Sequence, residues 1–198
     1  MTATTYPKAR GAWASPDNYG AALVPGDVRF FVQHVAQSPD APGTIGWFRN
    51  PAAQVSAHFI IDRDGVVYQC VPLNRMAWAE MDFNNRAIST EHIGYTGQKL
   101  THKQLHASLE LLIWLHQQFP QVPLHRTANP NGSGVIMHGE LGVLGGDHPD
   151  CPGWPIQAQF NIGLRPALMK PIEQAVYAAE HRSLLLHLLT HPFRKVTR

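Results

Sequence analysis

The sequence contains few cysteines, few charged residues and no long apolar run, and each of these shortages excludes a class of protein. Among its 198 residues only Cys70 and Cys151 are cysteines, too few for the disulfide framework of a small secreted domain. Charged residues make up 15% of the chain and the formal net charge is +2, so composition gives no reason to expect a nucleic-acid or membrane-surface partner. No window approaches the roughly 18 apolar residues of a transmembrane helix, so no transmembrane segment is expected.

The first 25 residues also lack the basic start and apolar segment of a Sec-type signal peptide. We therefore expect a chain that is made in the cytoplasm without such a leader. What the sequence does contain is a hydrophobic fraction of 44%, enough for one buried core, and 12 histidines. Histidine carries protons near neutral pH and is a common metal ligand, so these residues are the first candidates for chemistry.

Short apolar runs predict the strands. The runs His58–Ile61 and Val66–Val71 flank the turn segment Asp62–Gly65, and this pattern predicts a β-hairpin. A mostly apolar run over 28–35 and a shorter run over 135–137 predict two further strands, each of which brings a histidine to its end.

Helical signals follow the hairpin. Thr101 and Gln104 have the spacing of a capping box, and leucines at helical spacing continue until Pro120 ends the pattern. Residues 139–155 are rich in glycine and proline and are predicted to be irregular, and a helical pattern resumes at about Pro166. Strands mixed with helices predict an α/β fold in which helices flank a central mixed sheet.

His34, His138 and Cys151 all lie where a strand or strand-like run meets a loop. Two imidazoles and one thiolate form a three-ligand zinc set that leaves a fourth position open, which is the catalytic arrangement. The residues alone leave a second interpretation open, because histidines often lie at strand ends without a role and a free cysteine is often a small buried hydrophobe.

The hairpin, together with Val55-Ser56-Ala57 before it and Val71-Pro72 after it, resembles a segment of the zinc-dependent N-acetylmuramoyl-L-alanine amidases. This type 2 amidase family includes phage endolysins and is related to peptidoglycan recognition proteins. The resemblance extends over roughly residues 27–156, and other family landmarks occur in the same order: His34, Ala77-Trp78, Asn85, Ile88–Glu91, Thr101–Gln104, His138 and Cys151-Pro152-Gly153.

The resemblance implies that His34, His138 and Cys151 bind Zn²⁺. Many relatives have aspartate at the third position, and Asp150 is an alternative ligand here, although Cys151 aligns better. A thiolate is also the softer ligand and the stronger one for zinc.

Two catalytic residues are implied as well. Glu91 would be the general base that takes a proton from the attacking water and passes it to the leaving amine. Relatives often carry a lysine two positions before the third ligand, where this chain has Pro149. The neighbouring His148 would then donate to the oxyanion in place of that lysine.

The chain also departs from the family pattern. The segment Ala77–Met81 reads Ala-Trp-Ala-Glu-Met where relatives usually have Ala-Trp-His-Ala-Gly, so a histidine at the edge of the groove is lost. Trp47, Trp78 and Phe83 are candidates for lining a saccharide or peptide groove, although core packing is the simpler account for at least one of them. His58 is expected to pack or to hydrogen-bond around the ligands rather than to bind zinc.

The resemblance implies hydrolysis of the amide bond between N-acetylmuramic acid and L-alanine in peptidoglycan, as in endolysin-type wall lysis. The alternatives are a non-catalytic peptidoglycan-binding module and a cytoplasmic amidase that recycles muropeptides. We expect a catalytic domain over 1–160, with a helical extension over 161–198 docked on it. The expected partners are the glycan strand and stem peptide of the cell wall, with no nucleic acid, and the expected state is a monomer.

Overall fold

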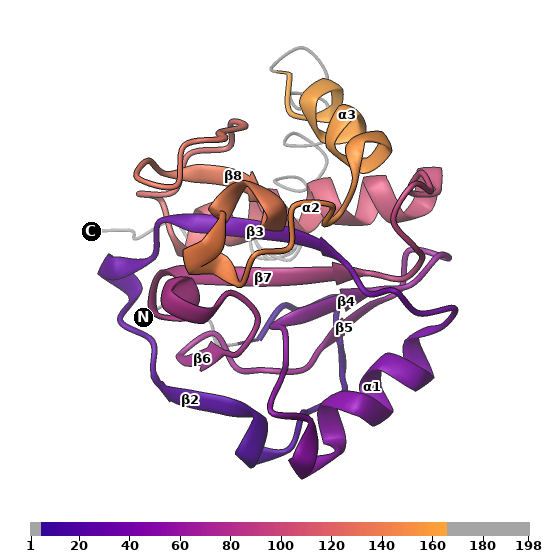
Figure 1. Cartoon of the computed structure of the whole chain (residues 1–198), viewed down its shortest axis with the longest axis vertical. Helices are drawn as coiled ribbons and strands as arrows, with labels where there is room; N and C mark the ends of the chain where they lie inside the picture. Colours follow the sequence, from indigo (N-terminus) through magenta and orange to yellow (C-terminus); the bar gives the residue numbers. More distant parts are fainter. Residues whose placement is uncertain (1–4, 166–198) are drawn as a thin grey trace, which may run out of the picture.

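A computed structural model describes residues 5–165 of the chain. Its centre is a six-stranded mixed sheet in the order β1-β5-β4-β7-β3-β8 (Figure 1). Neighbouring strands are parallel except in the antiparallel hairpin of β4 and β5. The strands are β1 (Arg10–Gly11), β3 (Phe30–Val35), β4 (Phe59–Ile61), β5 (Val67–Gln69), β7 (Ala87–His92) and β8 (Gly134–Met137), and a separate antiparallel pair is formed by β2 (Tyr19–Ala22) and β6 (Arg75–Ala77).

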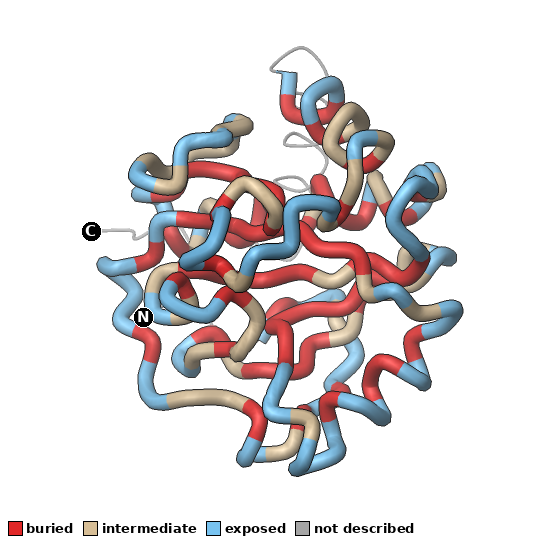
Figure 2. The backbone as a smooth tube through the Cα atoms, viewed as in Figure 1, coloured by how far each residue is buried: buried red, intermediate tan, exposed pale blue. Residues whose placement is uncertain are grey.

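Within residues 5–165, three α-helices cover the sheet: α1 (Ala41–Arg49), α2 (His102–Gln118) and α3 (Trp154–Gly163). Alternation along β4 separates the two faces, because Phe59 and Ile61 pack in one cluster with the buried residues of α2 and α3, whereas Ile60 packs in another with those of α1. Figure 2 shows the buried backbone concentrated along the central strands between these layers. The expected α/β architecture with flanking helices is therefore confirmed.

The capping box predicted for α2 is present. The Thr101 hydroxyl accepts the Gln104 N–H at 3.1 Å, and the Gln104 side-chain oxygen accepts the Thr101 N–H at 3.0 Å. The Gln104 amide also donates to the carbonyls of Ile61 and Ile93, so the cap fastens the start of α2 to the end of the sheet. The helix ends at Gln118, two residues before Pro120, because proline cannot supply the next backbone donor.

The predicted hairpin and the strand that ends beside His138 are also confirmed. Residues 139–153 form 3-10 turns and irregular backbone as expected, and α3 begins at Trp154. The predicted division after residue 160 falls inside α3, and the helical pattern from Pro166 onward lies outside the described residues. Among the described helices, none combines the length and apolar character needed to cross a membrane.

Candidate active site

The sheet register brings the first candidate residues together. In the parallel pair of β3 and β7, His34 lies opposite Glu91. In the parallel pair of β3 and β8, Gln33 lies opposite Met137, so His138 follows at the same edge as His34. The carboxyl ends of three neighbouring strands thus deliver two imidazoles and one carboxylate to a single place.

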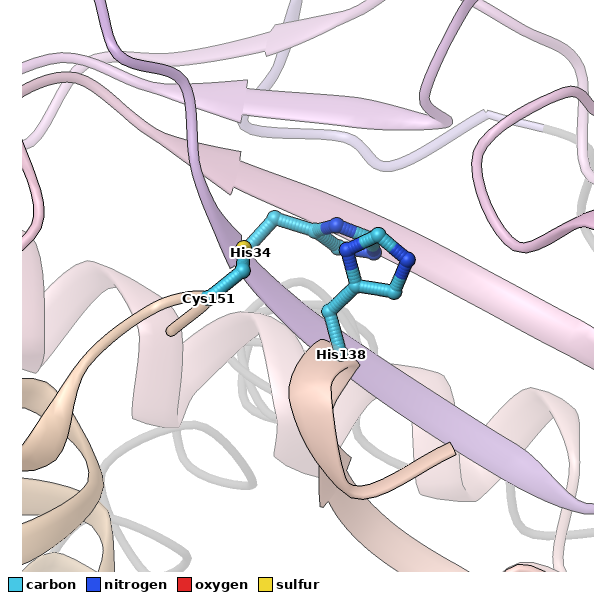
Figure 3. Close-up of side chains that lie close together, drawn as sticks. All are labelled: His34, His138 and Cys151. Atoms are coloured by element: carbon cyan, nitrogen blue, oxygen red, sulfur yellow. The ribbon is translucent and has the colours of Figure 1, made fainter. Parts of the chain in front are cut away.

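Cys151 reaches this edge on the loop that precedes α3. Its carbonyl accepts the N–H of Gly139, at 2.8 Å, which ties the loop to the turn that carries His138. The potential ligand atoms of His34, His138 and Cys151 all lie within 4.8 Å of one another (Figure 3). Asp150, the alternative third ligand, is exposed and is not a member of this cluster.

The two imidazoles are oriented by partners on their far sides. His138 Nε2 lies 2.8 Å from the Gly145 carbonyl oxygen, and His34 Nε2 lies 3.0 Å from Glu80 Oε1. Each ring therefore hydrogen-bonds through Nε2 and leaves Nδ1 available. Burial lowers the pKa of His34 to about 3 and that of His138 to about 4, so both rings are neutral at pH 7 and have an electron pair for a metal.

The donor set fits zinc. Burial raises the pKa of the Cys151 thiol to about 12, and coordination to a divalent cation is the ordinary way in which such a thiol loses its proton. Three nitrogen and sulfur ligands with a fourth position left open are typical of a catalytic zinc site, and soft sulfur disfavours magnesium or calcium. A zinc ion is thus the cofactor that these three residues would hold.

Glu91 lies beside the ligand cluster. Its Oε1 is 3.9 Å from His34 Nδ1, its side chain is 18% exposed, and its Oε2 is buried without a hydrogen-bond partner in the described structure. Burial and, to a smaller extent, the charge of the neighbouring Glu80 raise the pKa of this carboxyl group to about 8. A carboxyl group with these properties exchanges a proton near neutral pH, as a general base must.

Sequence reasoning did not single out Glu80 as a member of the site. It is completely buried, at 0% exposure, and burial raises the pKa of its carboxyl group to about 8. Glu80 belongs to the segment that departs from the family pattern, and that departure was the only available signal.

His148 lies at the rim rather than in the cluster. It is exposed, and its ring centroid is 4.9 Å from that of His138. Its side chain lines the same cavity as the ligands, so the structure brings it beside the site that the resemblance implied.

The three residues of the cluster line a cavity of about 990 Å³. Trp47 of α1, which is 53% exposed, lines this cavity together with Met81 and Gly146. The half-buried Trp78 also lines the cavity. Phe83 does not, because it is only 2% exposed and packs edge-on against Phe30, so the expectation that it lines the groove is wrong and the core interpretation holds.

Two other residues from the sequence belong to the interior. His58 is buried, with Nδ1 near the Ser89 hydroxyl and Nε2 near the Arg75 carbonyl, and it is not a member of the ligand cluster. Cys70 is a buried free thiol in the core cluster beside α1.

Comparison with known proteins supports the resemblance. Residues 25–154 match the profile of a family described as N-acetylmuramoyl-L-alanine amidase. Over 82 residues the chain is 38% identical to N-acetylmuramoyl-L-alanine amidase A of Achromobacter lyticus, a match that covers 41% of this chain and 45% of that protein. The chain therefore matches less than half the length of this curated relative.

Solved structures share the fold. AmpD superposes with a TM-score of 0.64 at 20% identity, covering 83% of this chain and 98% of AmpD. The amidase LysC from Clostridium intestinale gives 0.59 at 18% identity, covering 80% and 98%. Peptidoglycan recognition protein-LE, solved in complex with tracheal cytotoxin, a monomeric diaminopimelic acid-type peptidoglycan, gives 0.61 at 13% identity, covering 81% and 95%.

We expect the purified protein to bind one zinc ion per chain and the Cys151→Ser variant to bind it far more weakly. Loss of a hydrogen-bond partner of a ligand typically lowers metal affinity by about 10–100-fold, and loss of the ligand itself should lower it more. The measurement is zinc content after dialysis, supported by the thiolate-to-cobalt absorption band of the Co²⁺ form. Cys70→Ala is the matched control and should keep both the zinc content and the cobalt absorption band. Equal zinc content in Cys151→Ser and the wild type would contradict the assignment of Cys151 as a ligand.

Proposed function

The chain belongs to the N-acetylmuramoyl-L-alanine amidase family (Amidase_2), and we propose that it hydrolyses the amide bond between N-acetylmuramic acid and L-alanine of peptidoglycan. The observation that carries the proposal is that one cavity contains both the His34, His138 and Cys151 cluster and the partly buried carboxylate of Glu91. Family membership alone does not separate an enzyme from a binding protein. The presence of a complete ligand set beside a proton acceptor favours the enzyme.

The three ligands would hold zinc, which when bound polarises the scissile carbonyl and increases the acidity of water. Glu91 would take the proton from the attacking water and deliver it to the amine of the departing L-alanine. Its side chain lines the cavity and is 18% exposed, which supports a carboxylate that water in the cavity can reach. A cation nearby would lower the pKa of Glu91 from about 8, which keeps the carboxylate ionised at neutral pH and ready to accept.

His148 would stabilise the oxyanion that forms when water adds to the carbonyl. Its ring lies 4.9 Å from that of His138, outside the ligand cluster, and this supports a role as an N–H donor rather than as a ligand. A donor aimed at developing negative charge lowers the barrier more than it improves binding of the substrate.

The walls of the cavity would bind the sugar and the stem peptide. Trp47 offers an exposed flat ring on one wall, and aromatic rings of this kind pack well against the apolar face of a sugar. We propose the wall polymer as the substrate, as for an endolysin-like lytic enzyme. Soluble muropeptides, the substrates of a recycling amidase, are the alternative.

Digestion of purified peptidoglycan tests the activity. We expect new L-alanine amino termini in mass spectra while the glycan strands stay intact, and we expect a zinc chelator to abolish them. Parallel digestion of soluble muropeptides distinguishes polymer from fragment as the substrate. Binding to the wall without new termini would overturn the proposal and leave a non-catalytic binding module.

The Glu91→Gln variant should lose activity and keep its metal. We expect kcat to fall by about 10²–10⁴-fold, because the amide cannot accept the proton that the carboxylate accepts. Zinc content measured on the same sample should match that of the wild type. Glu110→Gln, which alters a carboxylate on α2 away from the cavity, is the control, and equal kcat values for the two variants would exclude Glu91 as the base.

The His148→Ala variant should lower kcat while KM stays nearly constant. Loss of one oxyanion donor typically costs about 10²–10³-fold in kcat, and an exposed donor should be at the lower end of this range. His106→Ala removes an exposed histidine on α2 and serves as the control. A rise in KM at unchanged kcat would assign His148 to substrate binding instead.

A further inference from the structure

Glu80 is a buried carboxylate for which the proposed reaction has no use. It lies in the Ala77–Met81 segment, where the chain departs from the pattern of its relatives. Taking a carboxylate out of water is costly unless it gains partners. Its Oε1 has His34 Nε2 as a partner at 3.0 Å, and the Ser89 hydroxyl nearby also lowers the pKa of the carboxyl group.

The backbone fixes Glu80 in this inward position. The Asn84 side-chain oxygen accepts the N–H groups of both Ala79 and Glu80, at 3.0 and 2.7 Å. The Glu80 carbonyl accepts the N–H of Phe83, whose ring is buried against Phe30. A turn held at both ends therefore points the carboxylate at His34, so the contact is built into the fold.

We infer that Glu80 is a positioning residue, which accepts the Nε2 hydrogen of His34 and so holds Nδ1 of that ring toward the metal. This inference rests on the metal site of the proposed function. When Nδ1 of an imidazole binds a cation, Nε2 must carry the hydrogen, and that hydrogen needs an acceptor. Glu80 Oε1 is the acceptor that the structure provides.

The two histidine ligands differ in this respect. His138 is oriented by a neutral acceptor, the Gly145 carbonyl oxygen at 2.8 Å, whereas His34 is oriented by a carboxylate. A carboxylate acceptor makes the imidazole a more basic and stronger ligand than a carbonyl does. It also adds a negative charge near the cluster, which a neutral carbonyl does not.

The test is the zinc affinity of the full chain, measured by competition with a chromogenic chelator. We expect the affinity of Glu80→Ala to fall by about 100-fold and that of Glu80→Gln by about 10-fold, the ends of the range found for such partners. Gln keeps an acceptor oxygen and loses only the charge, so it separates the two contributions. The Co²⁺ spectrum of Glu80→Ala should also change, because the His34 ring is no longer fixed.

The control is Glu110→Gln, which alters a carboxylate on α2 away from the cavity and should leave the zinc affinity unchanged. Thermal unfolding of the metal-free variants checks the fold, and if Glu80→Ala does not fold, Glu80→Gln carries the test. If Glu80→Gln and Glu80→Ala both fold and both bind zinc with wild-type affinity, the inference is overturned. Weakened zinc binding in these variants would sustain it even if the wild-type protein did not cleave peptidoglycan, and a wild-type chain that binds no zinc would overturn it.

Discussion

The parallel pairing of β3 with β7 on one side and β8 on the other is the constraint on which the candidate site depends. Along β3, Phe31 and Val35 pack under α2, while Phe30 and Val32 form a separate cluster on the opposite face. A slip of one residue would exchange these two sets, and it would turn His34 away from the cavity. The same apolar alternation that stabilises the sheet therefore fixes His34 beside Glu91 and His138.

Burial then determines the chemical state of the site. It lowers the pKa values of His34 and His138 and raises those of Glu80 and Glu91. Each shift has the same physical cause, because a charged form loses more hydration than a neutral one when it leaves water. The result is a pair of neutral imidazoles beside two carboxyl groups that resist ionisation. These carboxyl groups either keep their protons or ionise when a cation binds nearby.

Sequence reasoning worked where the signal is local. The hairpin around Gly65 and the capping box at Thr101 depend on residues a few positions apart, and both were predicted. The helix α1 was not predicted, because proline and two glycines mask its pattern. It forms because Asp40 caps its start, accepting the Gly43 N–H at 2.7 Å, and because Ile45 and Phe48 are buried against the sheet.

Sequence reasoning was weaker where the relevant contact joins distant parts of the chain. Residue types alone left His34, His138 and Cys151 open to a structural interpretation, and only the resemblance to a family singled them out. Glu80 reaches His34 across 46 residues, so no spacing rule could have paired them. The exposure of Trp47 and the burial of Phe83 likewise depend on tertiary packing, not on their neighbours in the sequence.

The same long-range packing decides whether a loop residue can serve as a ligand. His34 comes from a strand, but Cys151 comes from irregular backbone, which by itself would hold a ligand poorly. Glu140 compensates for this: its Oε2 accepts the Met137 N–H at 2.8 Å, and its Oε1 accepts from Arg126 at 2.6 Å and from Gln157 of α3 at 2.9 Å. One carboxylate thus joins the end of β8 to the helix that follows Cys151. A rigid surrounding structure is what a three-ligand metal site requires, and here a loop obtains it from side-chain contacts with two elements.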